Sequence, residues 1–339
     1  EYGRIEVAGD LNLAAAVNAS LYFLRSSLRN DTFFGISPGG LASNGYHGHV
    51  FWDQETWMYP PMLLLEPASA EAMLQYRFLR LNEAREKAQN CVANSNTESY
   101  CQDGIDMNSE AVMFPWESAV SGKEVQYSNG LIGNWGKYEQ HITGDIALAV
   151  KMFYTLTQNV RWLEDIGFPI LNGTASFFAS RIEDDTINFV MPPDEFACPV
   201  NSSAYTNSVA KVALSFASEA SKILNLSQED DSPYEHFHQL SENILIPFDA
   251  KNQFHPEYLP FDTSKEIKQA DAVRCVRARI RNAHSLKHNV SKQVLLAFPL
   301  SVNMTQEALR NDLDVYSKLT SQKGPAMYVL SSYLSLSKT

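Results

Sequence analysis

The sequence predicts an all-α fold, in which the helices form a barrel and the functional residues lie on the connecting loops. Apolar residues recur at gaps of three and four in several segments, the spacing that places them on one face of a helix. Strand signals are few, and helices and strands do not alternate as a Rossmann or TIM-barrel architecture requires. The loops between the expected helices are long and rich in aromatic residues, and such loops commonly carry binding sites.

Five segments have the helical spacing, and they begin after Asp10, after Pro67, near Asp145, at about Thr206 and after Asn303. Asp10 is expected to cap the first helix, because its carboxylate can accept hydrogen bonds from the unpaired N–H groups there. The last helix is expected to begin with a capping box, since Gln306 follows Asn303 by three residues. The best strand signal is residues 186–191, so small β elements are expected only within loops.

Composition excludes two classes of partner. The chain has 339 residues and a net charge of -12, which repels phosphate backbones and anionic membrane surfaces, so neither nucleic acid nor membrane is expected as a partner. No apolar run approaches the roughly 20 residues that a membrane span needs. N-x-S/T sequons favour a secreted chain, although an Asn- and Ser-rich cytosolic protein would also contain them, and the compartment stays open. The sequons begin at Asn18, Asn30, Asn172, Asn201, Asn225, Asn289 and Asn303.

The segment from Ser37 to Pro61 has the composition of a sugar site. It contains glycines that allow a tight loop, and it places Trp52 beside Asp53. An aromatic ring stacks on the C–H face of a pyranose, and a carboxylate accepts hydrogen bonds from neighbouring hydroxyls. The alternative is a metal site at His47 and His49, which lacks a clear third ligand.

A second segment, Val190 to Asn207, offers a candidate acid. Asp194 and Glu195 follow a predicted strand and two prolines, which restrict the backbone there. Adjacent acids often form only a solvated turn, but Phe196 and Tyr205 predict partial burial. Burial raises the pKa of a carboxyl group and keeps it protonated, as a general acid requires.

Three further segments carry weaker signals. Trp116 and Glu117 again place a tryptophan beside a carboxylate, and Lys268 and Gln269 provide long side chains that can donate hydrogen bonds to hydroxyls. Residues 254–258 (FHPEY) fit either another site loop or a turn, and we favour the turn. We expect Trp116, Glu117, Lys268 and Gln269 to contact substrate.

These segments together resemble one family, glycoside hydrolase family 65. The resemblance covers Tyr2 to Met327 and rests on GYHGHVFWDQE, FPWESA, EQHITGDIA, MPPDEF followed by AYTN, FHPEY, KQAD and GPAM. It implies a toroid of six inner and six outer helices. It also implies an inverting α-glucosidase without metal or organic cofactor, in which Glu195 is the proton donor, Trp52 and Asp53 bind glucose, and Lys268 and Gln269 form a second binding pair.

The same resemblance implies a carbohydrate substrate with a terminal α-linked glucose, namely the glucosyl-α-1,2-galactosyl-hydroxylysine unit of collagen-type proteins. Acid trehalase or disaccharide phosphorylase activity, as in other members of the family, is one alternative. A glucoside-binding protein without catalytic activity is another.

Departures from the family pattern fall at three places. We expect residues 1–339 to form one partial barrel domain, incomplete at both ends, with probable loop insertions at residues 90–108 and 274–293. The basic residues of the second insertion could instead form a binding patch, although an unstructured insertion fits better. The family's general base lies in a tryptophan-threonine-glutamate motif. This sequence contains no such motif, so we expect the second catalytic carboxylate to be missing from it.

Overall fold

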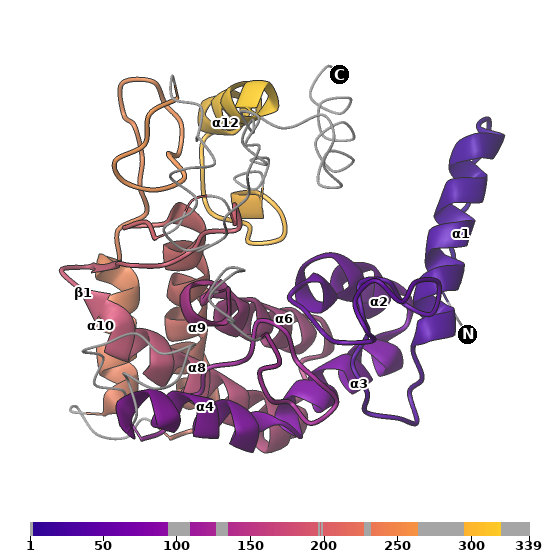
Figure 1. Cartoon of the computed structure of the whole chain (residues 1–339), viewed down its shortest axis with the longest axis horizontal. Helices are drawn as coiled ribbons and strands as arrows, with labels where there is room; N and C mark the ends of the chain where they lie inside the picture. The colour runs from indigo at the N-terminus through magenta and orange to yellow at the C-terminus, as the bar shows by residue number, and fades with distance from the viewer. Residues whose placement is uncertain are drawn as a thin grey trace, which may run out of the picture.

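The computed structural model describes residues 3–93, 109–126, 135–195, 197, 199–226, 232–263 and 295–319, and these residues are mostly helical (Figure 1). The α-helices are α1 (Leu11–Ser27), α2 (Tyr59–Leu65), α3 (Pro67–Phe78), α4 (Leu81–Ala93), α5 (Trp135–Tyr138), α6 (His141–Thr157), α7 (Val160–Trp162), α8 (Phe168–Arg181), α9 (Ala204–Ile223), α10 (Pro233–Asn243) and α12 (Gln306–Leu319). Two π-helical turns are η1 (Gln54–Met58) and η2 (Leu163–Gly167). The all-α prediction is confirmed.

The long helices differ in how far they are buried. Helices α6 and α9 pack against each other and are buried along most of their length. Helix α8 packs on both of them, and α10 packs on α9 from the outside, where only Phe237 and Ser241 of α10 are buried. The buried pair α6 and α9, with the exposed α10 outside, agrees with the toroid that the sequence predicts.

Helix α1 confirms its predicted cap but not its predicted burial. The Asp10 carboxylate accepts a hydrogen bond from the Leu13 backbone N–H at 3.0 Å. Of the predicted apolar face within α1, however, only Leu21 is buried, while Leu13 is 51% exposed. The helix extends away from the other helices on one side of the molecule (Figure 1). Its apolar spacing therefore reflects a face that the described residues leave largely uncovered.

The strands of the described residues form one small antiparallel sheet, in which β1 (Ile182–Glu183) pairs with β2 (Thr186–Ile187). The strand predicted over 186–191 is thus shorter than expected. Its continuation makes an isolated bridge between Val190 and Val200, with N–H···O distances of 3.0 and 2.8 Å in the two directions. This bridge closes the loop that contains the two predicted acids.

Two predicted boundaries need correction. Helix α12 begins after Thr305, whose hydroxyl accepts from the Ala308 N–H at 3.1 Å, so the cap is Thr305 and not Asn303. Helix α4 continues to Ala93, so the first residues of the insertion predicted at 90–108 are helical. The remainder of that insertion lies outside the described residues, as does the whole of 274–293. Within the described part of the chain, no helix is long and apolar enough to cross a membrane.

Candidate active site

The segment with Trp52 and Asp53 is held between two other parts of the chain. Val50 and Ser118 exchange backbone hydrogen bonds of 3.0 and 2.9 Å, which tie this loop to the loop that contains Trp116. Directly after Asp53 the chain enters the π-helical turn η1. Such turns are rare and are frequent at functional sites, because the extra residue per turn redirects the neighbouring side chains.

A buried ion pair fixes η1 beneath Asp53. The Arg77 guanidinium donates to both carboxylate oxygens of Glu55 at 2.8 and 2.9 Å, and both side chains are 1% exposed. Arg77 also donates to the Phe51 carbonyl at 3.3 Å, and Gln54 Nε2 donates to Glu55 at 2.6 Å. Two parallel hydrogen bonds restrict both position and orientation. The backbone on either side of Asp53 is therefore held from the protein interior.

Trp52 lies against a buried network of charged and aromatic side chains. Its ring meets the His141 ring edge-on at 4.7 Å and the Tyr205 ring at 6.1 Å. His141 contacts Asp145 at 2.8 Å and Glu139 at 3.1 Å, while the Tyr205 hydroxyl donates to Asp145 at 2.7 Å. Burial alone lowers the pKa of His141, but Asp145 and Glu139 raise it to about 9. The histidine is therefore an imidazolium at neutral pH.

The loop with Trp116 and Glu117 is organised by one carboxylate. Glu124 accepts from the backbone N–H of Trp116 at 2.8 Å and from that of Glu117 at 3.1 Å. Lys87, which is 5% exposed, donates to the same carboxylate at 2.8 Å. Both predicted site residues are half-buried, so the loop presents them with a fixed backbone and partly accessible side chains.

The histidines considered as metal ligands have another arrangement. His49 Nδ1 lies 2.8 Å from Glu117 Oε1, and the His47 ring lies 6.0 Å from the His49 ring. Within the residues that the structure places, no group of His, Cys, Asp and Glu side chains is arranged to hold a metal ion. His49 instead joins the Trp52 loop to the Trp116 loop.

Glu195 lies in a turn that follows Pro192 and Pro193; its side chain is half-buried, and the neighbouring Asp194 is fully buried. The Met191 N–H donates to the Tyr138 carbonyl at 2.7 Å and so anchors this segment to α5. Trp135, also in α5, donates its indole N–H to Glu195 Oε2 at 2.9 Å. The partial burial predicted for the two acids is therefore found, although Phe196 itself lies outside the described residues.

A row of aromatic rings connects Glu195 with the Trp52 loop. The Trp135 ring stacks on Trp116 with 5.2 Å between centroids and 16° between planes. Trp116 in turn packs edge-on against Phe51 at 5.0 Å, next to Trp52 in sequence. The structure thus brings the predicted proton donor, the predicted Trp116 platform and the predicted glucose-binding pair into one region.

The FHPEY loop, residues 254–258, contacts the N-terminal end of α9. The Glu257 carbonyl accepts from the Ala204 N–H at 2.9 Å, at the first residue of α9. His255 Nδ1 contacts Asp312 of α12 at 2.8 Å, and both residues are buried. The segment is therefore a largely buried loop and not the simple turn that the sequence favoured, and its Tyr258 side chain is half-buried.

Two predicted substrate-binding residues, Lys268 and Gln269, lie outside the described residues. Other residues of the site were not predicted. The sequence around Arg77 and Trp135 contains no pattern that predicts their role. His141 stands four residues before Asp145, a spacing that places both on one helix face and could have predicted their contact.

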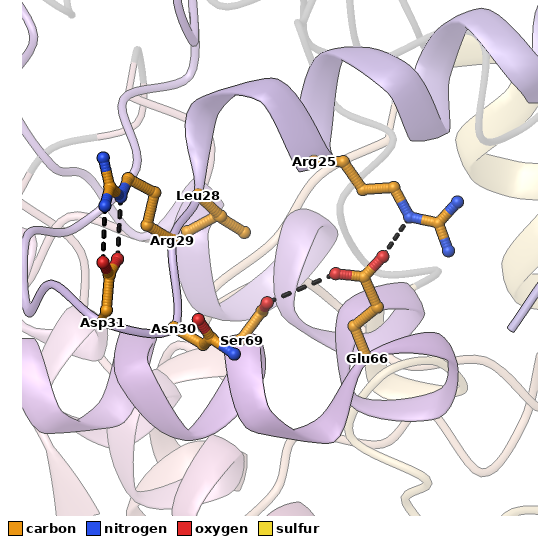
Figure 2. Close-up of a pocket in the computed structure, with 7 residues that line it drawn as sticks. All are labelled: Arg25, Leu28, Arg29, Asn30, Asp31, Glu66 and Ser69. Carbon is orange, nitrogen blue, oxygen red and sulfur yellow. Dashed lines mark hydrogen bonds and ion pairs between the residues drawn. The ribbon is translucent and has the colours of Figure 1, made fainter. Parts of the chain in front are cut away.

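A pocket of about 440 Å³ lies between residues 25–31 and residues 66–69 (Figure 2). It is lined by Arg25, Leu28, Arg29, Asn30, Asp31, Glu66 and Ser69. Arg25 pairs with Glu66, and Ser69 donates to Glu66 at 3.3 Å. No residue predicted to bind or cleave substrate lines it.

Comparison with known protein families agrees with the sequence motifs. Residues 18–334 match the description "Glycosyl hydrolase family 65 central catalytic domain". The chain belongs to glycosyl hydrolase family 65. The resemblance inferred from GYHGHVFWDQE, MPPDEF and the other motifs is therefore confirmed.

Individual relatives of this family 65 chain carry related names. A protein-glucosylgalactosylhydroxylysine glucosidase of Dictyostelium discoideum is 43% identical over 95% of the chain, and one of Danio rerio is 36% identical over 95%. A kojibiose hydrolase of Flavobacterium johnsoniae is 37% identical over 95%. The chain spans 41%, 45% and 41% of the lengths of these three relatives, respectively.

A solved structure supports the fold. A chain from the human microbiome that carries the name of a kojibiose phosphorylase superimposes with a TM-score of 0.68. The match has 19% sequence identity and covers 90% of this chain and 42% of the other. At this identity the likeness extends to the helical architecture alone.

Proposed function

We propose that the complete protein is an inverting α-glucosidase that removes a terminal glucose from a disaccharide unit, with Glu195 as the general acid. The observation that carries the proposal is the position of Glu195. Its half-buried carboxyl group accepts the Trp135 indole N–H, within the aromatic row that leads to Trp52. Partial burial favours the protonated form of a carboxyl group, and an accepted N–H bond stabilises the carboxylate that remains once the proton has been transferred.

In this mechanism Trp52 and Asp53 hold the terminal glucose. Asp53 accepts hydrogen bonds from sugar hydroxyls, and the buried Glu55–Arg77 pair keeps its backbone in place. Trp116 and Glu117 border the neighbouring sugar, and Lys268 and Gln269 form the second binding pair that the family pattern assigns. Fixed positions matter because a misplaced substrate loses much of the rate gained from orientation.

Cleavage then takes one displacement. Glu195 donates its proton to the glycosidic oxygen while water attacks the anomeric carbon from the opposite face, and the electrons of the broken C–O bond go to the leaving oxygen. A second carboxylate removes a proton from that water, and in inverting enzymes the two carboxyl groups stand roughly 6.5–9.5 Å apart. The family pattern assigns this base to the tryptophan-threonine-glutamate motif, so activity assays require the complete natural protein.

The names of two kinds of relative support a substrate in which glucose is linked to a second sugar. The names of the Dictyostelium discoideum and Danio rerio relatives specify a glucosylgalactosylhydroxylysine substrate, and that of the Flavobacterium johnsoniae relative specifies kojibiose. We assign glucosyl-α-1,2-galactosyl-hydroxylysine of collagen-type proteins as the substrate. The share of identical residues is higher for the Dictyostelium discoideum relative than for the kojibiose hydrolase.

Phosphorolysis is the second candidate, because a kojibiose phosphorylase of Thermoanaerobacter brockii is 30% identical over 78% of the chain. The test is glucose release by the complete protein from glucosylgalactosyl-hydroxylysine and from kojibiose, with and without inorganic phosphate. We expect free glucose from the hydroxylysine glycoside at a rate that does not depend on phosphate. Formation of glucose 1-phosphate, or no cleavage of either glycoside, would overturn the proposal.

A further inference from the structure

We propose that Trp135 is a positioning residue for the acid, a role that rests on the proposed function of Glu195. Its indole N–H holds Glu195 Oε2, so that the acid proton is carried by Oε1 and the carboxylate formed on proton transfer is stabilised. The distance from Nε1 to Oε2 is 2.9 Å, within the range of a well-formed hydrogen bond. The two residues are 60 positions apart in sequence.

The Trp135 ring has little freedom to turn. One face stacks on Trp116 with an interplanar angle of 16°. The next residue, Gly136, is tied to Lys87, which donates to the Gly136 carbonyl at 3.1 Å, and to Gln126, whose side chain accepts the Gly136 N–H at 3.3 Å. The N–H group that faces Glu195 is therefore fixed from both the ring and the backbone.

Glycine at position 136 permits this anchorage. A Cβ atom there would lie 2.8 Å from Glu124 Oε2 and 2.9 Å from Glu124 Cδ, closer than van der Waals contact allows. Glu124 also accepts the Trp116 N–H and the Lys87 ammonium. One buried Lys87–Glu124 pair thus sets the position of both stacked tryptophans, and through Trp135 it reaches the carboxyl group of Glu195.

The hydrogen bond from Trp135 determines which oxygen of Glu195 carries the acid proton. An oxygen that accepts an N–H bond cannot donate a proton along it, so the bond at Oε2 directs the proton to Oε1. When that proton moves to the glycosidic oxygen, Glu195 becomes a carboxylate, and a hydrogen bond to a charged acceptor is about twice as strong as one between neutral groups. The contact therefore strengthens as the reaction proceeds. It stabilises the transition state more than the bound substrate and so raises kcat with little effect on binding.

The contact can be tested without substrate. The full chain has five tryptophans, so labelling with ¹⁵N-tryptophan gives one indole signal for each, and Trp135→Phe identifies the signal of Trp135. Between pH 3 and pH 8 this signal should move with a single titration step, and the step should be absent in Glu195→Gln. A Trp135 signal with the same pH dependence in the wild type and in Glu195→Gln would overturn the proposal.

Activity of the complete protein gives the second readout. Trp135→Phe keeps the ring but removes the N–H, so kcat should fall roughly ten- to a hundredfold with little change in KM. The alkaline limb of the pH–rate profile should move up by roughly 0.5 to 1 pH, because the ionised acid loses a stabilising donor.

The matched control is Trp162→Phe. The Trp162 indole nitrogen is buried and has no hydrogen-bond partner among the residues the structure describes, so the same substitution there should leave kcat and the pH profile unchanged. Identical profiles for the two variants would contradict the role of Trp135. If the wild type cleaves no glucoside, the proposed function fails, while the indole titration still decides whether Trp135 senses Glu195.

Discussion

The Trp52–Asp53 side and the Glu195 side of the site are held by different kinds of interaction. Behind the first lie buried charges: the Glu55–Arg77 pair, and His141 between two carboxylates. The second is an irregular loop that a backbone bridge, one indole N–H and a stack of aromatic rings hold in place. Buried charges thus support the backbone at Asp53 directly, whereas on the Glu195 side the buried Lys87–Glu124 pair acts through the two stacked tryptophans.

This difference suits the two tasks that we propose for these sides, glucose binding and proton donation. Recognition of one sugar requires donors and acceptors at fixed positions, because a buried polar group without its partner costs free energy. An acid must change its charge during the reaction, and a half-buried loop tolerates both the protonated and the ionised form. The variants below separate the two sides, from the largest expected effect to the smallest.

Replacement of Arg77 by Met should have the largest effect. Glu55 would remain buried, and the Gln54 amide would be its remaining donor among the residues that the structure describes; loss of one partner of a buried ion pair costs about 3–5 kcal/mol of unfolding free energy. Urea unfolding followed by circular dichroism measures it. The double variant Glu55→Leu/Arg77→Met should recover most of the loss, since no unpaired charge remains. Equal stability of Arg77→Met and the wild type would show that the pair does not hold this side.

The His141 network predicts a pH dependence. The folded-state pKa of His141 is about 9, against 6.5 for the free side chain, so its contribution to stability is complete below about pH 6.5 and is lost as the pH rises through 9. The difference in unfolding free energy between the wild type and His141→Gln should therefore be largest at pH 6 and shrink by pH 9.5. A difference that stays constant across this interval would contradict a charged His141.

The aromatic side should be less sensitive to loss of a charge. In Lys87→Met, Glu124 keeps the N–H groups of Trp116 and Glu117 as donors, so we expect a loss of about 1–3 kcal/mol, smaller than for Arg77→Met. Thermal unfolding of both variants under one buffer condition makes the comparison. A larger loss in Lys87→Met would reverse the ranking of the two sides.

The smallest effect is expected at the outer pocket of Figure 2, where Arg29 pairs with Asp31 at 2.7 Å on the surface. Solvent and salt screen an exposed pair of this kind. Arg29→Ala should therefore unfold at the wild-type temperature and bind glucosides unchanged. A clear drop in either would mean that this pocket is coupled to the site.

The sequence predicted features that depend on local pattern. The helical class, the Asp10 cap and the grouping of Trp52, Trp116 and Glu195 follow from spacing and from motifs. Local pattern could not separate Asn303 from Thr305 as the cap of α12, because both side chains can cap a helix.

Contacts between residues far apart in the sequence could not be predicted from local pattern. Glu55 and Arg77 are 22 residues apart, and Trp135 and Glu195 are 60 apart, so only the packing of the helices brings each pair together. The periodicity of α1 predicted an apolar face, but periodicity does not specify which part of the protein covers it. The side chains that hold the site, such as Arg77 and Trp135, could therefore be identified only from the structure.

The central claim is that Glu195 protonates the leaving oxygen in a single inverting displacement. Proton NMR of the glucose released by the complete protein, recorded before mutarotation, tests it most directly. The wild type should release β-glucose first from an α-glucoside, and Glu195→Gln should lower the rate by several orders of magnitude while it still binds the substrate. Release of α-glucose first, or a wild-type rate in Glu195→Gln, would contradict the account.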